Sequence, residues 1–192
     1  MATNDTKTAI LDSAQDLIQR LGANAMSYDD ISKAVGIRKA SIHYHFPSKE
    51  NLIEALLERY NETFLKIVDG LFAGKDSEDK KLLKYMGLFE GTLREGDHDK
   101  ACLCGMLGAE LSSFGSVTAE RIRYFYNENE KRLANLLDNG KKKGVFKFKG
   151  SSKKLAPVIF SFLEGALLTA RAEGGVKKFQ TVKEQMMDLV KN

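Results

Sequence analysis

The 192-residue chain contains no tryptophan, only two prolines and only two cysteines. Because proline interrupts helices, a chain with only Pro47 and Pro157 leaves long stretches free to be helical. Its β-branched residues never form the alternating runs that are typical of strands. Cys102 and Cys104 are too few for a disulfide framework and indicate a reducing compartment. These scarcities favour an all-α protein.

Long hydrophobic runs are scarce as well. No stretch reaches the roughly 18 consecutive apolar residues that a membrane span needs. The first twenty residues lack the basic start and the apolar centre of a signal peptide. No catalytic triad pattern, phosphate-binding loop or H-E-x-x-H metal motif appears. The sequence therefore predicts a cytoplasmic protein that is not an enzyme, uses no cofactor and does not associate with membranes.

What the chain does have is apolar residues at helical spacing along most of its length. The expected helices cover residues 10–21, 27–35, 38–45, 49–73, 78–95, 102–114, 116–140, 152–173 and 176–190. We therefore expect an all-α fold of about nine helices.

Two short helices near the N-terminus are joined by a tight turn. Ser27 and Asp30 form an S-x-x-D pattern close to a capping box, which predicts a helix start. That helix stops at Gly36, and the next ends at Phe46 because the residue before proline leaves the α region. Residues 31–49 carry four basic side chains and no acidic one. This is the arrangement of a helix-turn-helix that faces a polyanion.

The segment from residue 27 to 56, SYDDISKAVGIRKASIHYHFPSKENLIEAL, resembles the DNA-binding region of the TetR (tetracycline-repressor) family of bacterial regulators. The shared features are Gly36-Ile37, then Tyr44-His45-Phe46, then a Ser-Lys-Glu helix start at residue 48. The resemblance covers residues 6–60 well and the rest only in length and helical character. It implies a three-helix DNA-binding domain over residues 1–50 and an effector-binding and dimerisation domain over residues 51–192.

The recognition helix is expected from about residue 39 to 45. Ala40 and Ser41 are small and would let it approach the bases closely. Ile42 and Phe46, four residues apart, would anchor it in a core that includes Leu21.

By resemblance, Lys39 and Ser41 read bases. The phosphate contacts are expected from Ser27, Tyr28, His43, Tyr44, His45 and Lys49. His43 stands where family members often carry tyrosine. For Tyr44 and His45 the alternative is half-buried packing, and for Lys39 it is simple solvation.

The resemblance also implies a small-molecule effector and a homodimer. The expected pocket residues are Phe64, Tyr85, Met86, Phe89, Met106, Glu110, Phe114 and Tyr124. The expected dimer residues are Phe160, Leu163 and Leu167, on a helix that is apolar over more than one face. For both sets the alternative is ordinary packing within one chain.

Together these features predict a repressor that binds a palindromic double-stranded operator as a homodimer and is released by a small molecule. In the bacterial cytoplasm it would be nucleoid-associated when bound to DNA. One alternative is a thiol- or metal-responsive sensor that uses Cys102 and Cys104 with His98, although C-x-C spacing and the missing fourth ligand fit a metal poorly. The other is a helical ligand-binding protein without DNA binding.

Overall fold

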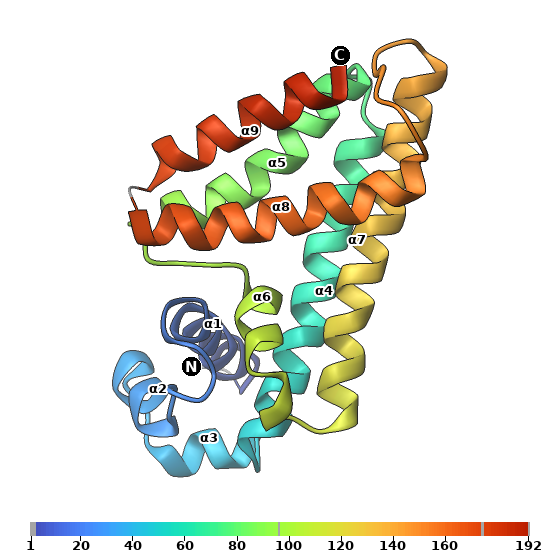
Figure 1. Cartoon of the computed structure of the whole chain (residues 1–192). Coiled ribbons are helices and arrows are strands. Elements are labelled where there is room, and N and C mark those ends of the chain that lie inside the picture. Colours follow the sequence, from blue (N-terminus) through green and yellow to red (C-terminus); the bar gives the residue numbers. More distant parts are fainter. Residues whose placement is uncertain (1–2, 96, 174, 192) are drawn as a thin grey trace. The chain divides into compact units, whose positions relative to one another are not determined.

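The computed structural model describes residues 3–95, 97–173 and 175–191. These residues form nine α-helices, one short 3-10 helix and no strand (Figure 1). The elements are α1 (Thr3–Leu21), α2 (Tyr28–Val35), α3 (Lys39–His45), α4 (Lys49–Ala73), α5 (Glu78–Glu95), α6 (Leu103–Ala109), η1 (Leu111–Ser113), α7 (Ser116–Lys142), α8 (Ser152–Glu173) and α9 (Val176–Lys191). The all-α prediction is confirmed.

One predicted helix differs in the structure. The sequence predicted a single helix over residues 102–114, but α6 ends at Ala109 and η1 follows. Glu110 separates them with φ −106° and ψ 20°, outside the α-helical region. The prediction of one helix was wrong because Glu110 makes contacts far away in the sequence, which local periodicity does not reveal.

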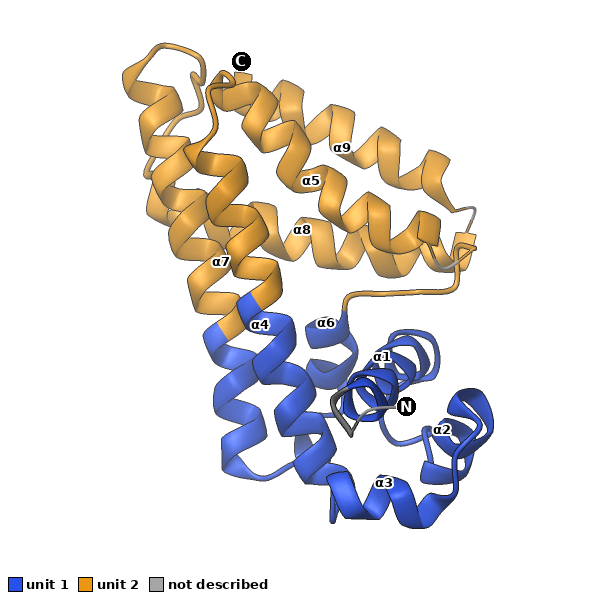
Figure 2. Ribbon diagram, turned by 180° about the vertical axis from the view of Figure 1, so that it is seen from behind, with its two compact units in different colours: residues 1–62, 103–124 blue, residues 63–102, 125–192 orange. Residues whose placement is uncertain are grey.

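The chain divides into two compact units (Figure 2). Unit 1 consists of residues 1–62 and 103–124, and unit 2 of residues 63–102 and 125–192. The long helices α4 and α7 each contribute to both units. Residues 51–62 and 103–124 therefore belong to the same compact unit as the helix-turn-helix. The division of function after residue 50 stays a prediction.

The core of unit 1 is a small aliphatic cluster. Ile10 and Ile18 of α1, Ile31 of α2 and Ile42 of α3 are all fully buried. Each such side chain contributes about 1.5–3 kcal/mol to folding relative to an exposed one. Leu21, expected in the same core, is instead 57% exposed at the last position of α1. The buried set fixes α3 by one face and leaves its other face free.

Unit 2 is built on an aromatic core. Its helices α5, α8 and α9 pack against one another (Figure 2). The rings of Phe64, Tyr85, Phe89, Phe125 and Phe160 meet edge to face, with centroid distances of 5.1 to 6.2 Å. Such pairs add about 0.5–1.5 kcal/mol each beyond the area that they bury.

Helix α8 is the one described helix that is long and apolar enough to cross a membrane, by length and composition alone. A core helix passes the same test, and the inner face of α8 is part of the core of unit 2. One such helix is weak evidence for a membrane span.

Candidate nucleic-acid interface

The start of α2 is fixed by a complete capping box. The Ser27 hydroxyl oxygen accepts a hydrogen bond from the Asp30 N–H at 3.3 Å, and the Asp30 carboxylate accepts one from the Ser27 N–H at 2.9 Å. The Ser27 hydroxyl also donates to that carboxylate at 2.6 Å. These bonds lower the pKa of Asp30 and confirm the predicted start. The Ser27 hydroxyl proton is therefore already donated to Asp30, and a phosphate would have to displace that carboxylate to accept it.

Gly36 ends α2 in the left-handed region, with φ 72° and ψ 33°. Glycine adopts this conformation without the strain that a Cβ would introduce. The turn allows α3 to begin only three residues later, at Lys39. This confirms the predicted tight connection between the two short helices.

Helix α3 has one buried and one exposed face. Ile42 is fully buried and Phe46, just after the helix, is 3% exposed, as predicted for the anchors. On the other face Lys39, Ala40, His43 and Tyr44 are exposed, while Ser41 and His45 are half-buried. Tyr44 is 78% exposed and therefore not half-buried, and its ring meets that of His45 edge to face at 5.2 Å. A helix with this face fits the major groove of B-DNA, which is about 12 Å wide.

Tyr28 braces α2 against the end of α3. Its hydroxyl donates to the backbone oxygen of Phe46 at 2.9 Å, and its ring lies 4.8 Å from that of His43. Burial raises the pKa of Tyr28 to about 12, so the hydroxyl keeps its proton. Because that proton is already donated to the Phe46 carbonyl, a phosphate would have to displace this bond, and the Tyr28 contact with DNA stays a prediction.

The cations of the motif are partly engaged within the protein. Lys39 forms an ion pair with Asp29 at 2.9 Å, and Lys33 binds the same carboxylate at 2.6 Å. Their hydrogen bonds and charges lower the pKa of Asp29 to about 2. The half-buried Lys49 donates to the Met26 carbonyl at 2.6 Å, and desolvation lowers its pKa. DNA must therefore displace Asp29 from Lys39 in order to use that ammonium.

The eight predicted pocket residues are divided between the two units. Phe64, Tyr85, Met86 and Phe89 belong to the aromatic core of unit 2. Met106, Glu110, Phe114 and Tyr124 belong to unit 1, where Tyr124 is 52% exposed. The carboxylate of Glu110 is engaged by backbone N–H groups. It is therefore not free to hold an effector in this state.

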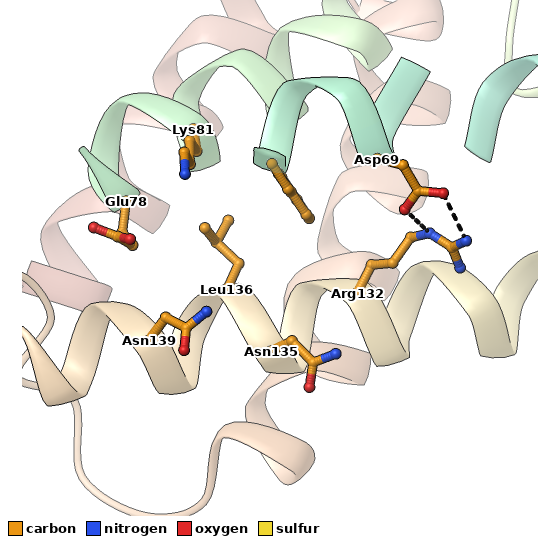
Figure 3. Close-up of a pocket in the computed structure, with 8 residues that line it drawn as sticks. Asp69, Glu78, Lys81, Arg132, Asn135, Leu136 and Asn139 are labelled. Atoms are coloured by element: carbon orange, nitrogen blue, oxygen red, sulfur yellow. Dashed lines mark hydrogen bonds and ion pairs between the residues drawn. The ribbon is translucent and has the colours of Figure 1, made fainter. Parts of the chain in front are cut away.

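A polar pocket of about 180 Å³ lies in unit 2, between the end of α4, the start of α5 and α7 (Figure 3). Its lining is Asp69, Phe72, Glu78, Lys81, Arg132, Asn135, Leu136 and Asn139. The guanidinium of Arg132 donates to both carboxylate oxygens of Asp69, at 2.7 and 3.0 Å. None of the eight predicted effector residues lines this pocket.

The three predicted dimer residues face inward. Phe160, Leu163 and Leu167 are buried in unit 2, which leaves them no free surface for a second chain. The periodicity of a helix that is apolar on several sides does not reveal which side turns outward, and this caused the error.

The outward face of α8 is also apolar. Val158, Phe162 and Leu168 are all exposed there. A mainly apolar groove of about 480 Å³ lies along the same side and reaches α9. It is lined by Ser161, Phe162, Gly165, Ala166, Thr169 and Val182.

The cysteines do not form a metal site. In the described parts of the chain no group of three or more His, Cys, Asp and Glu side chains is placed to hold a metal ion. Cys102 and Cys104 are free thiols and both are buried. Cys102 forms a hydrogen bond with the carboxyl of Glu164, whose pKa is raised to about 7 by burial.

Comparison with known proteins agrees with this geometry. Residues 10–56 match the family model for bacterial regulatory proteins of the tetR family. The chain is 30% identical to a TetR transcriptional regulator from Legionella pneumophila, with a TM-score of 0.85, over 95% of this chain and 96% of that one. A TetR-family regulator from Agrobacterium tumefaciens is 29% identical, with a TM-score of 0.93, and covers 99% of this chain and 100% of its own.

Among curated proteins, the HTH-type transcriptional repressor ComR of Escherichia coli is 23% identical over 177 residues, which are 92% of this chain and 84% of ComR. These relatives are regulators and not enzymes. This chain is likewise a DNA-binding transcriptional regulator, and it belongs to the TetR family of bacterial regulatory proteins.

Proposed function

We propose that the protein is a repressor that binds a palindromic operator as a homodimer and leaves it when a small molecule binds. The exposed face of α3 carries this proposal, because Lys39, Ala40, His43 and Tyr44 project outward while Ile42 holds the helix to the core. ComR and NemR of Escherichia coli are both named as HTH-type transcriptional repressors, which supports repression here, and NemR is 21% identical to this chain over 192 residues.

The roles on the DNA divide between bases and backbone. Lys39 and Ser41, on the first turn of α3, read bases. The phosphate contacts come from Ser27, His43, Tyr44, His45 and Lys49. Tyr28 contributes through its position at the start of α2, where helix amides lack intrahelical partners, and not through its hydroxyl.

The outward face of α8 supports the homodimer. A single helix-turn-helix makes few phosphate contacts, so two copies are needed for strong binding, and a two-fold dimer matches a palindrome. The exposed Val158, Phe162 and Leu168 and the adjoining groove offer an apolar surface that a second copy would cover. Functionally, residues 1–50 would bind DNA and residues 51–192 would bind the effector and the partner.

The effector would bind in unit 2. Phe64, Tyr85, Met86 and Phe89 are the predicted pocket residues that the structure brings together there. A transcriptional regulator from Saccharomonospora viridis, 20% identical with a TM-score of 0.81, has been solved in complex with choline. That complex supports a small organic molecule as the effector class for this fold.

The thiol-sensor alternative has less support. Reactive cysteines lie in partly exposed, electropositive surroundings. Cys102 and Cys104 are buried, and Cys102 faces the carboxyl of Glu164. If replacing both cysteines with serine left derepression unchanged, thiol sensing would be excluded.

The proposal is tested by selecting duplexes from a randomised DNA library with the purified full-length protein. We expect enrichment of a palindrome with half-sites about one helical turn apart, and binding that weakens steeply with salt. The double variant Lys39→Ala/Tyr44→Ala serves as the control and should enrich no sequence. If the wild-type protein enriched none either, operator recognition would be refuted.

A further inference from the structure

The connection between α1 and α2 (residues 22–26, the α1–α2 turn) is held by a carboxylate that is distant in sequence. Glu110 accepts a hydrogen bond from the Ala23 N–H at 2.7 Å and a second from the Asn24 N–H at 3.1 Å. The Asn24 amide group also donates to the Ser113 hydroxyl at 3.2 Å. The segment of α6 and η1 thus caps the turn from which α2 starts.

The contact with Glu110 also explains why residue 22 is a glycine. It has φ +87°, which favours glycine, and a Cβ placed on it would lie 2.6 Å from Oε1 of Glu110. The lack of a side chain at Gly22 therefore allows both the left-handed conformation of the turn and the close approach of the Glu110 carboxylate. The turn thus offers the Glu110 carboxylate both the space and the two N–H donors that it binds.

The same segment is tied to α4 as well. The Glu50 carboxylate, in the first turn of α4, accepts a hydrogen bond from the Gly115 N–H at 2.8 Å. The charge of Glu110 also acts on Lys49, which donates to the Met26 carbonyl within the α1–α2 turn. Residues 110–115 therefore hold both ends of the helix-turn-helix.

We propose that Glu110 is the positioning residue that sets α2 and α3 for DNA binding. This inference rests on the proposed operator recognition.

The sign of the effect separates this role from simple electrostatics. A carboxylate near a DNA-binding surface repels phosphates, so its removal should strengthen binding of any DNA. If Glu110 positions the motif, its removal should weaken binding to the operator. The two explanations therefore predict opposite outcomes for the same substitution.

The test measures the affinity of full-length variants for the operator selected by the wild-type protein and for a random duplex of equal length. Glu110→Ala should bind the operator about tenfold more weakly, because an ionised acceptor of backbone N–H groups is lost. Glu110→Gln should lie in between, since an amide oxygen still accepts a hydrogen bond. The matched control is Glu120→Gln, at an exposed carboxylate on α7 of the same unit, and it should lose no affinity.

Two further measurements separate positioning from general stability. Amide hydrogen exchange at Ala23 and Asn24 should accelerate in Glu110→Ala at a temperature where thermal unfolding shows the variant fully folded. In a double-mutant cycle, Gly22→Ala should cost less binding in the Glu110→Ala background than in wild type, because the clash with Oε1 is gone. Operator affinity at or above the wild-type level in a folded Glu110→Ala dimer would overturn the proposal, as would strict additivity in the cycle.

Failure of the proposed function gives a different pattern. If no operator is selected, the exchange rates of the α1–α2 turn and the same cycle measured on the free energy of unfolding still report whether Glu110 holds the turn. Unchanged exchange at Ala23 and Asn24 would then overturn the positioning role by itself.

Discussion

At the residue scale, Lys39, the proposed base-reading residue, is paired with a carboxylate of its own protein. Asp29 holds both Lys39 and Lys33, and these partners lower its pKa to about 2, so it is ionised at physiological pH. An exposed pair of this kind adds little to stability. Its main effect is on binding, because DNA has to exchange one anion for another at Lys39.

This exchange leads to a prediction on two substitutions. Lys39→Ala should weaken operator binding by about 1–3 kcal/mol and relax the preference at the base that it contacts. Asp29→Asn should strengthen binding to all DNA, because it frees two ammonium groups and removes a negative charge. Titrations with operator and random duplexes measure both effects. Asp138→Asn, which breaks the similarly exposed Lys142–Asp138 pair in unit 2, is the control and should leave DNA affinity as it was.

A second prediction concerns Glu164 and pH. Burial raises the pKa of this carboxyl to about 7, above its value of 4.5 in water. Because the folded state prefers the protonated form, Glu164 stabilises the fold fully below about pH 4.5, and this contribution is lost as the pH rises through 7. Glu164→Gln should therefore gain about 3 kcal/mol of stability relative to wild type between pH 4.5 and pH 8.

Urea unfolding of both proteins at several pH values measures that difference. Glu120→Gln, at an exposed carboxylate, should show none. A pH-independent difference between Glu164→Gln and wild type would show that Glu164 is ionised in the folded protein.

At the element scale, the helix boundaries show which structural features can be recognised from the sequence alone. The cap of Ser27 with Asp30, three residues apart, occurs as the local pattern indicated. The helix start predicted at residue 48 is also capped, because the Ser48 hydroxyl accepts a hydrogen bond from the Asn51 N–H. The break at Glu110 depends on partners 86 and 87 residues away, which no window of sequence contains. Local bonds were therefore predictable, whereas the bonds between distant segments needed the folded chain.

The bracing of α2 against α3 predicts two opposite phenotypes. Tyr28→Phe removes the hydroxyl that bonds to the Phe46 carbonyl, so it should lower the free energy of unfolding by about 1 kcal/mol and leave the DNA affinity of the folded protein nearly unchanged. Tyr44→Ala should do the reverse, because Tyr44 is exposed and available to a phosphate. Chemical unfolding and DNA titration of both variants form a matched pair, and equal effects on both quantities would contradict the assignment.

At the scale of the whole molecule, the sequence indicated that α8 is apolar on several sides but not how it is oriented. Phe160, Leu163 and Leu167 complete the core of unit 2, and Phe162 lies on the opposite face. The orientation depends on how α5 and α9 pack against α8, which is a property of three distant segments together. For the same reason the helix-turn-helix, set by nearby residues, was predicted in more detail than the effector pocket.

The outward face of α8 makes the homodimer testable by a single substitution. Phe162→Glu places a charge where 53% of the phenylalanine surface is exposed, so the chain should still fold, while a partner seated on this face would have to bury the carboxylate. We expect a monomer in analytical ultracentrifugation and a loss of operator affinity. The monomer should still unfold in a cooperative thermal transition, because its core is unchanged. Leu83→Glu, at an exposed leucine of α5 in the same unit, is the matched control and should remain a dimer that binds DNA. If Phe162→Glu also remained a dimer with full operator affinity, the subunits would have to meet through another surface, and the apolar groove beside α8 would need a different occupant.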